Sequence, residues 1–186
     1  EIEVVHTRKE QYKDKNSRNP ETEYGTIQED AMRRDLTINA LYYNVSTEKY
    51  LDITGNGYKD ILDGLVRVTS TPEIVFCDDA LRILRCVRFA TRYNFDIDEE
   101  TMMGMKANIS RLSTITTERI NDEFSKILMC GKAWKGLKTL FSLGAFDYIF
   151  KSSSTVLETY ADESYRNEVI QVIKDRCRFC YSDENA

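Results

Sequence analysis

The most informative stretch of the sequence reads Asp78-Asp79-Ala80-Leu81-Arg82-Ile83-Leu84-Arg85-Cys86-Val87-Arg88-Phe89-Ala90-Thr91-Arg92. On a helix that turns ~100° per residue, its four arginines fall within an arc of roughly 120°. The opposite side carries the apolar side chains Ile83, Leu84, Cys86, Val87 and Ala90. The pattern predicts a helix from Asp78 or Asp79 to about Tyr93 with a packed face and a face of guanidinium groups. Such groups suit phosphates and base edges. The alternative is a solvated face with local Asp–Arg pairs.

Asp79 and Arg82 stand one helical turn apart, so we expect their side chains to be neighbours. An acceptor beside a donor matches the amino group and ring nitrogen of cytosine or adenine. Uracil and guanine present a carbonyl and an N–H at those places. The two residues therefore form a candidate base reader, and the alternative is a simple salt bridge within the helix.

A second stretch reads Arg33-Arg34-Asp35-Leu36-Thr37-Ile38-Asn39-Ala40. Two arginines, a carboxylate and an amide lie within two helical turns, just before a predicted strand. This set could hold a phosphate and a ribose hydroxyl, or it could simply open a surface helix.

Length and composition describe an ordinary globular chain. Its 186 residues are 41% hydrophobic and 31% charged, which suits one large or two small domains. The formal net charge is −5, so nucleic-acid binding by bulk charge is excluded and any phosphate contact must come from a local cluster. No apolar run approaches the ~20 residues of a membrane span. We expect a cytoplasmic protein with no membrane partner, and an organellar location stays open.

The cysteines do not indicate a disulfide framework, because their number is odd and their spacing irregular. They are Cys77, Cys86, Cys130, Cys177 and Cys180. Cys177 and Cys180 form a lone C-x-x-C, and a zinc site would need two more ligands. We interpret the spacing as chance, with a zinc or redox site as the alternative.

The order of predicted elements changes after Pro72. Before it, we expect strands at 1–8, 42–45, 50–53 and 65–68, a loop at 11–24, and a turn at 55–57. The capping box of Thr26 and Glu29 predicts a short helix to about Leu41. After Pro72 we expect helices at 78–93, 99–109, 116–130 and 133–150, the last broken at Gly144, and weaker helical periodicity at 160–180. The fold class is therefore α+β.

Four ordered motifs carry a resemblance to a known family. They are Arg33-Arg34-Asp35-x-x-x-Asn39-Ala40-Leu41, Asp52-x-x-Gly55-x-Gly57-x-x-Asp60, Asp78-Asp79-x-x-Arg82-x-x-Arg85-x-x-Arg88-Phe89, and Glu118-Arg119-Ile120-x-x-Glu123-x-x-Lys126-Ile127-Leu128. In this order they resemble the class II tRNA nucleotidyltransferases, the CCA-adding enzymes, and their bacterial poly(A) polymerase relatives. The resemblance covers roughly residues 1–150.

The resemblance implies a role for each matching position. Nucleotide-binding residues would be Arg34, Asp35, Asn39, Asp79, Arg82, Arg85 and Arg88. The first two would contact the sugar and phosphates, with Asn39 supporting them. Asp79 and Arg82 would read the base, and the two later arginines would extend the contact toward the phosphates. The segment 52–60 would be a flexible element, and 118–128 would brace the neck helices.

The implied fold is the C-terminal part of a nucleotidyltransferase palm, with a small mixed sheet, followed by an all-α neck and body. The domains would be 1–70 for the head, 71–130 for the neck that recognises the base, and 131–186 for the start of the body. The implied reaction adds CMP and AMP from CTP and ATP to the 3′ end of tRNA or another RNA, with Mg²⁺ as cofactor. Poly(A) polymerase activity, a catalytically silent nucleotide- or RNA-binding fragment, and an unrelated helical scaffold are the alternatives.

The sequence departs from the family at the metal site, an Asp-x-Asp downstream of a Gly-Gly-x-Val-Arg-Asp loop. Asp96-Ile97-Asp98 has the spelling, but Asp98 is interpreted as the N-cap of the following helix. Glu3 is a candidate third catalytic carboxylate, and the alternative is an edge-strand charge. We expect the main metal ligands upstream of residue 1, lost by truncation or proteolysis or carried by a separate N-terminal chain. The chain alone is then expected to be inactive.

Overall fold

The structure is a computed structural model, and it describes residues 5–11 and 21–150. Glu3, the Cys177–Cys180 spacing and the helix expected at 160–180 lie outside these residues. The strands are β1 (Arg8–Gln11), β2 (Glu21–Tyr24), β3 (Leu41–Asn44), β4 (Lys49–Asp52), β5 (Leu65–Val66) and β6 (Asp96–Ile97). The α-helices are α1 (Ile27–Met32), α2 (Gly57–Asp63), α3 (Pro72–Asp78), α4 (Leu81–Tyr93), α5 (Glu99–Asn108), α6 (Thr117–Leu128), α7 (Ala133–Ser142) and α8 (Phe146–Ile149). Two short 3₁₀ helices are η1 (Thr37–Asn39) and η2 (Ile109–Thr114).

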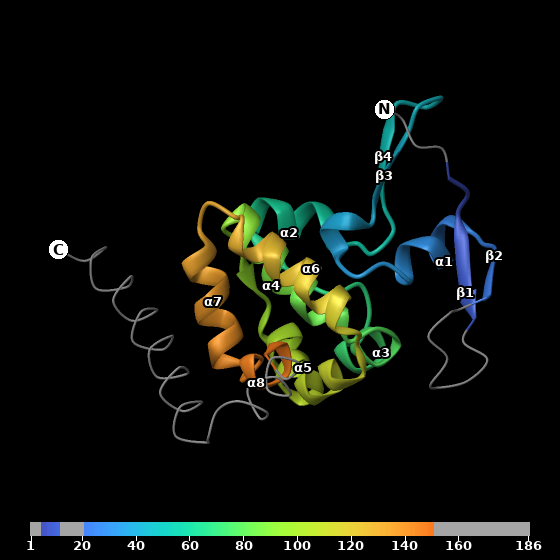
Figure 1. Cartoon of the computed structure of the whole chain (residues 1–186). Helices are drawn as coiled ribbons and strands as arrows, with labels where there is room; N and C mark the ends of the chain where they lie inside the picture. Colours follow the sequence, from blue (N-terminus) through green and yellow to red (C-terminus); the bar gives the residue numbers. More distant parts are fainter. Residues whose placement is uncertain (1–4, 12–20, 151–186) are drawn as a thin grey trace, which may run out of the picture.

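Helices α2 to α8 gather into one body, and the hairpin of β3 and β4 projects from it (Figure 1). Helix α1 lies beside the small β1–β2 ladder at the edge of this body (Figure 1). The pairs β1–β2 and β3–β4 are antiparallel, whereas β5 and β6 pair in parallel. Small sheets followed by a helical body confirm the predicted α+β class.

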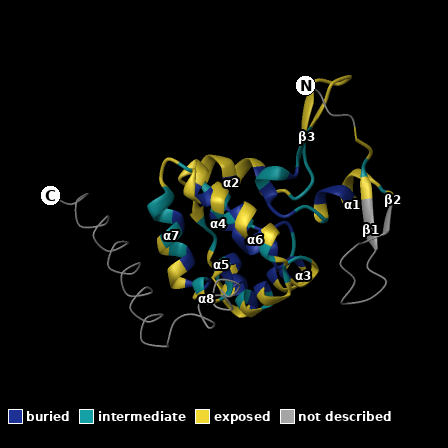
Figure 2. Ribbon diagram, in the orientation of Figure 1, coloured by how far each residue is buried: buried dark blue, intermediate teal, exposed yellow. Residues whose placement is uncertain are grey.

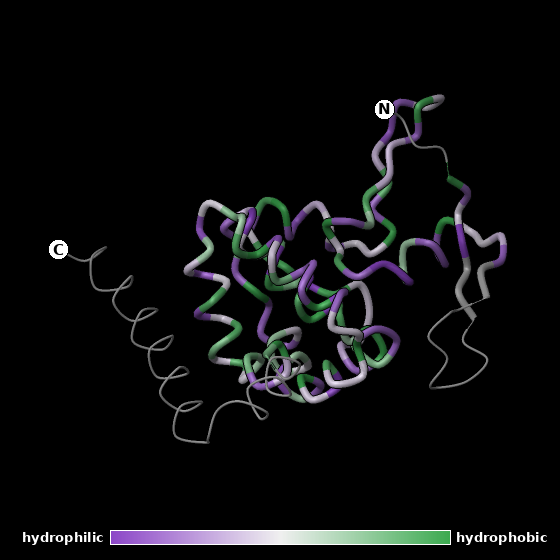
Figure 3. Tube along the Cα trace, viewed as in Figure 1, coloured by the Kyte–Doolittle hydropathy of each residue, from purple (hydrophilic) through white to green (hydrophobic). Residues whose placement is uncertain are grey.

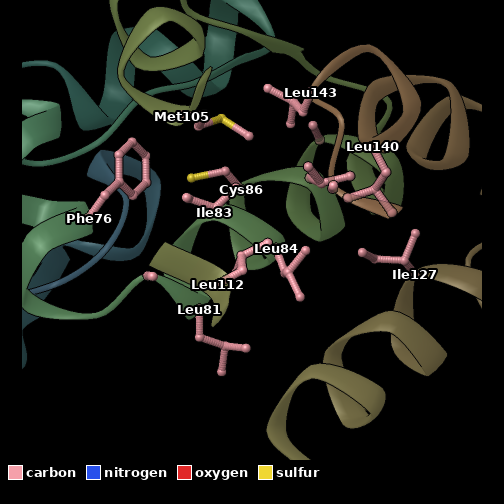
Figure 4. Close-up of a cluster of buried hydrophobic side chains, with 14 of the residues drawn as sticks. Phe76, Leu81, Ile83, Leu84, Cys86, Met105, Leu112, Ile127, Leu140 and Leu143 are labelled. Carbon is pink, nitrogen blue, oxygen red and sulfur yellow. The ribbon is translucent and has the colours of Figure 1, made fainter. Parts of the chain in front are cut away.

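Helix α4 forms the centre of the hydrophobic core. Ile83, Leu84, Cys86 and Val87 are fully buried, as the apolar face of the predicted helix requires. Neighbouring helices supply the other core side chains, among them Phe76, Met105, Ile127 and Leu140 (Figure 4). Figure 2 shows the buried residues concentrated inside this helical body, whereas the tip of the β3–β4 hairpin is exposed. Burial of this apolar face fixes the position of the arginines that share the helix.

The N-terminal elements correct two predictions. The helix after the capping box ends at Met32 rather than near Leu41. Leu36 is extended and bridges to Val68, because this buried leucine joins the core through strand pairing instead of a helical face. Within the described residues, the strand predicted at 1–8 begins only at Arg8, where β1 starts. The predicted loop at 11–24 contains β2, which pairs with β1. Both strands are polar, so they lack the alternation that identifies a strand in sequence.

Two short helices were also not predicted from the sequence. Helix α2 begins at Gly57, within the expected turn, and α3 runs from Pro72 to Asp78. A Cβ on Gly57 would lie 2.6 Å from the Thr37 carbonyl oxygen, so this close approach of two segments requires glycine. Asp79 is extended and ends α3, and α4 begins only at Leu81.

Other boundaries were predicted correctly. The β3–β4 hairpin is present, and Asp98 caps α5 by accepting a hydrogen bond from the Thr101 amide. Gly144 separates α7 from α8 with a φ of +68°. The tube in Figure 3 shows apolar and polar residues alternating along these short helices. Within residues 5–11 and 21–150, every helix is too short or too polar to cross a bilayer.

Candidate functional site

Asp30, in the first turn of helix α1, binds both arginines of the Arg33-Arg34-Asp35 stretch. Its Oδ1 accepts a hydrogen bond from Arg33 Nε at 3.0 Å. Its Oδ2 accepts from Arg34 Nε at 3.1 Å and from Arg34 Nη2 at 2.9 Å. The Tyr42 hydroxyl also donates to Oδ2, at 2.6 Å, and the Arg8 amide donates to Oδ1 at 3.1 Å. The carboxylate is only 2% exposed and is saturated with donors.

These donors set the protonation state of Asp30. Burial alone would raise its pKa, but the hydrogen bonds from Tyr42, the Arg8 amide and the two arginines outweigh it. The pKa of Asp30 therefore lies well below its usual range. Burial and the bond to Asp30 raise the pKa of Tyr42 to about 12, so its hydroxyl stays a donor at neutral pH.

Asp35 connects the same stretch to helix α4. Arg85 Nε donates to Asp35 Oδ2 at 2.6 Å, and Asn39 Nδ2 donates to Oδ1 at 3.1 Å. Burial would raise the pKa of Asp35, but the charge and hydrogen bond of Arg85 dominate and lower it. The carboxylate stays ionised and holds one arginine of α4 in place.

Arg82 makes the second connection. Its Nη2 donates to the carbonyl oxygen of Arg33 at 2.8 Å, and its side chain is only 12% exposed. Arg82 and Arg85 therefore hold the backbone and the carboxylate of the Arg33-Arg34-Asp35 stretch from one helix face. We call this set, Arg34, Asp35, Asn39, Arg82 and Arg85, the arginine cluster.

Arg88 and Asp79 face helix α6 instead. Arg88 Nε donates to Glu123 Oε2 at 2.7 Å, and its guanidinium lies 4.3 Å from the ring centre of Phe89. Asp79 Oδ2 accepts from Arg119 Nη2 at 2.7 Å, while its Oδ1 accepts the amide of Leu81. Asp79 thus pairs with α6, and among the described residues no side-chain hydrogen bond or ion pair joins it to Arg82.

Neither sequence alternative for the arginine face describes it fully. The face is not simply solvated, because Arg82, Arg85 and Arg88 are partly or largely enclosed. Their short contacts reach acceptors 35 to 50 residues away in sequence, rather than the next turn of α4. The local contact, between Arg82 Nη1 and Asp78 Oδ2, is long at 4.0 Å. The arginines therefore join segments of the fold.

Two arginines keep donors available. Arg85 engages a carboxylate through Nε alone, so within the described part of the chain both terminal nitrogens are unpaired. Arg34 uses Nε, Nη1 and Nη2 once each, and each terminal nitrogen carries a second hydrogen. The two side chains are about one-third exposed, at 35% and 34%. Exposed N–H groups on pre-positioned guanidinium groups can donate hydrogen bonds to a phosphate.

The main metal ligands are expected upstream of residue 1, so the described part of the chain does not test that expectation. Within residues 5–11 and 21–150, no three His, Cys, Asp or Glu side chains come together in a way that could hold a metal ion. These residues therefore do not form the magnesium site that the resemblance implies, and we derive no step through a metal.

Sequence reasoning missed Asp30 and Arg119. Asp30 stands three and four residues before Arg33 and Arg34, a spacing that places an acid next to both arginines on a helix. That spacing could have identified Asp30 as a partner of both arginines from the sequence alone. Arg119 lies 40 residues from Asp79, and only the packing of α6 against α4 reveals their contact.

Comparison with known proteins places the chain in a family. A family model described as "Poly A polymerase head domain" matches residues 1–67, and one described as "Probable RNA and SrmB- binding site of polymerase A" matches residues 94–156. The tRNA nucleotidyltransferase cca1 of Schizosaccharomyces pombe is 41% identical over 153 residues, which covers 81% of this chain. The chain belongs to the CCA-adding enzyme and poly(A) polymerase family.

One further sequence relative and one solved structure are also similar to the chain. Poly(A) polymerase I of Escherichia coli O157:H7 is 34% identical over 152 residues, or 82% of this chain. The crystal structure of the Bacillus stearothermophilus CCA-adding enzyme in complex with CTP matches 69% of the chain with a TM-score of 0.65 and 29% identity. The chain spans 30% of the S. pombe relative, 32% of the E. coli relative and 32% of the B. stearothermophilus chain.

Proposed function

We propose that this chain is the nucleotide-recognition part of a tRNA nucleotidyltransferase that adds CMP and AMP to tRNA 3′ ends. The arginine cluster is the observation that carries the proposal. Two motifs that are 50 residues apart in sequence meet through Arg85 and Asp35. Their meeting leaves exposed guanidinium donors at Arg34 and Arg85, which suits the phosphates of CTP and ATP.

Asp79 and Arg82 are the proposed base readers. Each carboxylate oxygen can accept more than one hydrogen bond, so Asp79 can still accept from an exocyclic amino group. Arg82 would donate to the adjacent ring nitrogen. Because Arg119 and the Leu81 amide already fix the carboxylate, the acceptor would be held in place before a base arrives.

In the proposed reaction, the 3′ oxygen of the RNA attacks the α-phosphorus of the nucleoside triphosphate. The new bond joins that oxygen to phosphorus, and the bond to the β-phosphate oxygen breaks, releasing pyrophosphate. The hydroxyl proton is lost to solvent or base. The residues of the arginine cluster would bind and orient the triphosphate, and Mg²⁺ would be held by other residues.

The proposed organisation keeps the head at 1–70, the base-recognising neck at 71–130 and the start of the body at 131–186. Among the described residues, five of the six strands precede Pro72 and every helix of ten or more residues follows it, which supports the first boundary. Cytoplasmic tRNA, or the tRNA of an organelle, would be the partner, and imaging of the tagged protein distinguishes the two.

Equilibrium titration of the chain with the four nucleoside triphosphates tests the proposal. CTP and ATP should bind at least about tenfold more tightly than UTP and GTP, as expected when a polar mismatch is buried. Equal affinity for all four would contradict base recognition. A chimaera in which this chain replaces the matching segment of the S. pombe relative should then add CCA to tRNA that lacks it.

Poly(A) polymerase activity is the second candidate, since the E. coli relative shares 34% identity over 82% of the chain. The same titration distinguishes the two functions. A poly(A) polymerase requires ATP alone, so preference for ATP over CTP would favour it.

A further inference from the structure

We infer that Asp30 is a positioning residue, which sets Arg34 for the triphosphate. This inference rests on the proposed function, because it concerns how the same site is organised. Asp30 lies outside the motif residues assigned to the nucleotide. It would act through Arg34, whose Nε and Nη2 donate to its Oδ2.

The two oxygens of the Asp30 carboxylate bind different arginines. Oδ1 holds Arg33, and Oδ2 holds Arg34 through two parallel N–H donors. A two-pronged contact of this kind fixes the plane of the guanidinium as well as its place. Asn39 adds a third constraint, because its carbonyl oxygen accepts a hydrogen bond from Arg34 Nη1 at 2.9 Å.

Tyr42 completes the support from strand β3. Its hydroxyl donates to Oδ2, and the Arg34 guanidinium carbon lies 5.2 Å from the centre of its ring. Arg34 is therefore held at its edge by Asp30 and at its face by Tyr42. An arginine held in this way has lost its rotamer freedom before binding, so the cost of ordering it is not repeated when a phosphate arrives.

Helix α1 explains why the carboxylate stands at this point. The capping box of Thr26 and Glu29 fixes the start of the helix, and Asp30 follows in its first turn. The Arg8 amide also donates to Oδ1, which attaches strand β1 to the same carboxylate. Asp30 thus links β1, α1, β3 and the two arginines.

The test compares Asp30→Asn with a matched control, Asp98→Asn. Asp98 is another carboxylate that pairs with an arginine, Arg67, at 2.9 Å, and it caps a helix outside the arginine cluster. Both variants keep the shape of the side chain and remove its charge. The purified chain and each variant are titrated with CTP and ATP, and their thermal unfolding is followed in parallel.

Asp30→Asn should raise the Kd for CTP and ATP alike, by about tenfold or more, because removing the charge weakens the charge-assisted hydrogen bonds that hold Arg34. Asp98→Asn should lower the unfolding temperature and leave both Kd values unchanged. In a double mutant with Arg34→Ala, Asp30→Asn should add less than its single effect, since it acts through that arginine. A purely structural role would predict additive losses.

Wild-type affinity in folded Asp30→Asn overturns the inference, and so do equal losses in Asp30→Asn and Asp98→Asn. If Asp30→Asn does not fold, Tyr42→Phe takes its place, because it removes one donor from Oδ2 and keeps the ring against Arg34. Unchanged affinity in Tyr42→Phe would then overturn the inference. A wild-type chain that binds no nucleotide overturns the proposed function itself, which is a different result.

Discussion

Arg85 Nε donates to Asp35 Oδ2 over 2.6 Å and joins helix α4 to a segment 50 residues earlier in the chain. Asp35 is 6% exposed, so its charge depends on this partner. The pair does two things at once. It holds the loop after α1 against α4, and it orients a guanidinium whose terminal nitrogens remain available. Stability and nucleotide binding are therefore coupled at this contact.

Arg85→Ala should destabilise the fold, because it leaves the buried Asp35 carboxylate without its main partner. We expect a loss of about 2–3 kcal/mol in the free energy of unfolding, since removing one member of an enclosed ion pair strands the other charge. Urea denaturation measures it. The double variant Asp35→Asn/Arg85→Gln should recover part of the loss, and a double variant as unstable as the sum of the singles would contradict the coupling.

The free energy of unfolding should decrease at acidic pH, because Asp30 and Asp35 then become protonated. Both carboxyl groups have a folded-state pKa below the value of about 3.9 in an unfolded chain. Their contribution is therefore complete above that unfolded pKa and is lost as the pH falls through the lower folded pKa. Thermal unfolding between neutral and strongly acidic pH checks this. Asp35→Asn should lose less stability than wild type over the same range, and parallel curves would show that Asp35 makes no contribution.

Arg34→Ala should weaken CTP and ATP binding alike, because Arg34 would contact phosphates that both nucleotides share. A lost charge-assisted hydrogen bond costs about 1.5–3 kcal/mol, which corresponds to about tenfold or more in Kd. Titration of the variant with both nucleotides measures the effect. A loss confined to one nucleotide would instead place Arg34 at the base edge.

Much of the helical body could be predicted from the sequence, because its signals are local. The apolar face of α4, the N-cap Asp98 and the break at Gly144 each follow from spacing or from a single residue type. The segment around Leu36 could not be predicted in this way. It is extended because it bridges to Val68, and that pairing depends on residues more than 30 positions away.

The candidate site could likewise be predicted only in part, because some of its contacts are local and others depend on distant residues. The nucleotide-binding residues were predicted from motifs, but the partners of these residues were not. Arg88 pairs with Glu123 and Asp79 with Arg119, and both partners lie on α6. Such contacts require the packing of α6 on α4, which no spacing in a single stretch encodes. Asp30 is the exception, because its distance from Arg33 and Arg34 was readable on a helix.

Asp79→Ala should reduce the preference for CTP and ATP over UTP and GTP by about one to two orders of magnitude, because an amino group would then lack its acceptor. The variant also loses the bond to the Leu81 amide at the start of α4, at a cost of about 1 kcal/mol, which the fold should survive. Arg82→Ala should act in the same direction, and the double variant should lose less than the sum, because the two residues would read one base edge.

The contact between Asp79 and Arg119 sharpens this prediction. Arg119→Ala should lower base preference in the same direction as Asp79→Ala but by less, since the carboxylate remains and only its restraint is lost. Arg111→Ala is the matched control, because Arg111 is also an arginine near the end of α3 but donates to the Cys77 carbonyl instead. Titration of each variant with all four triphosphates gives the preference. If Asp79→Ala keeps the wild-type ratio of CTP to UTP affinity, Asp79 serves only to join α3 to α6, and the base is read elsewhere.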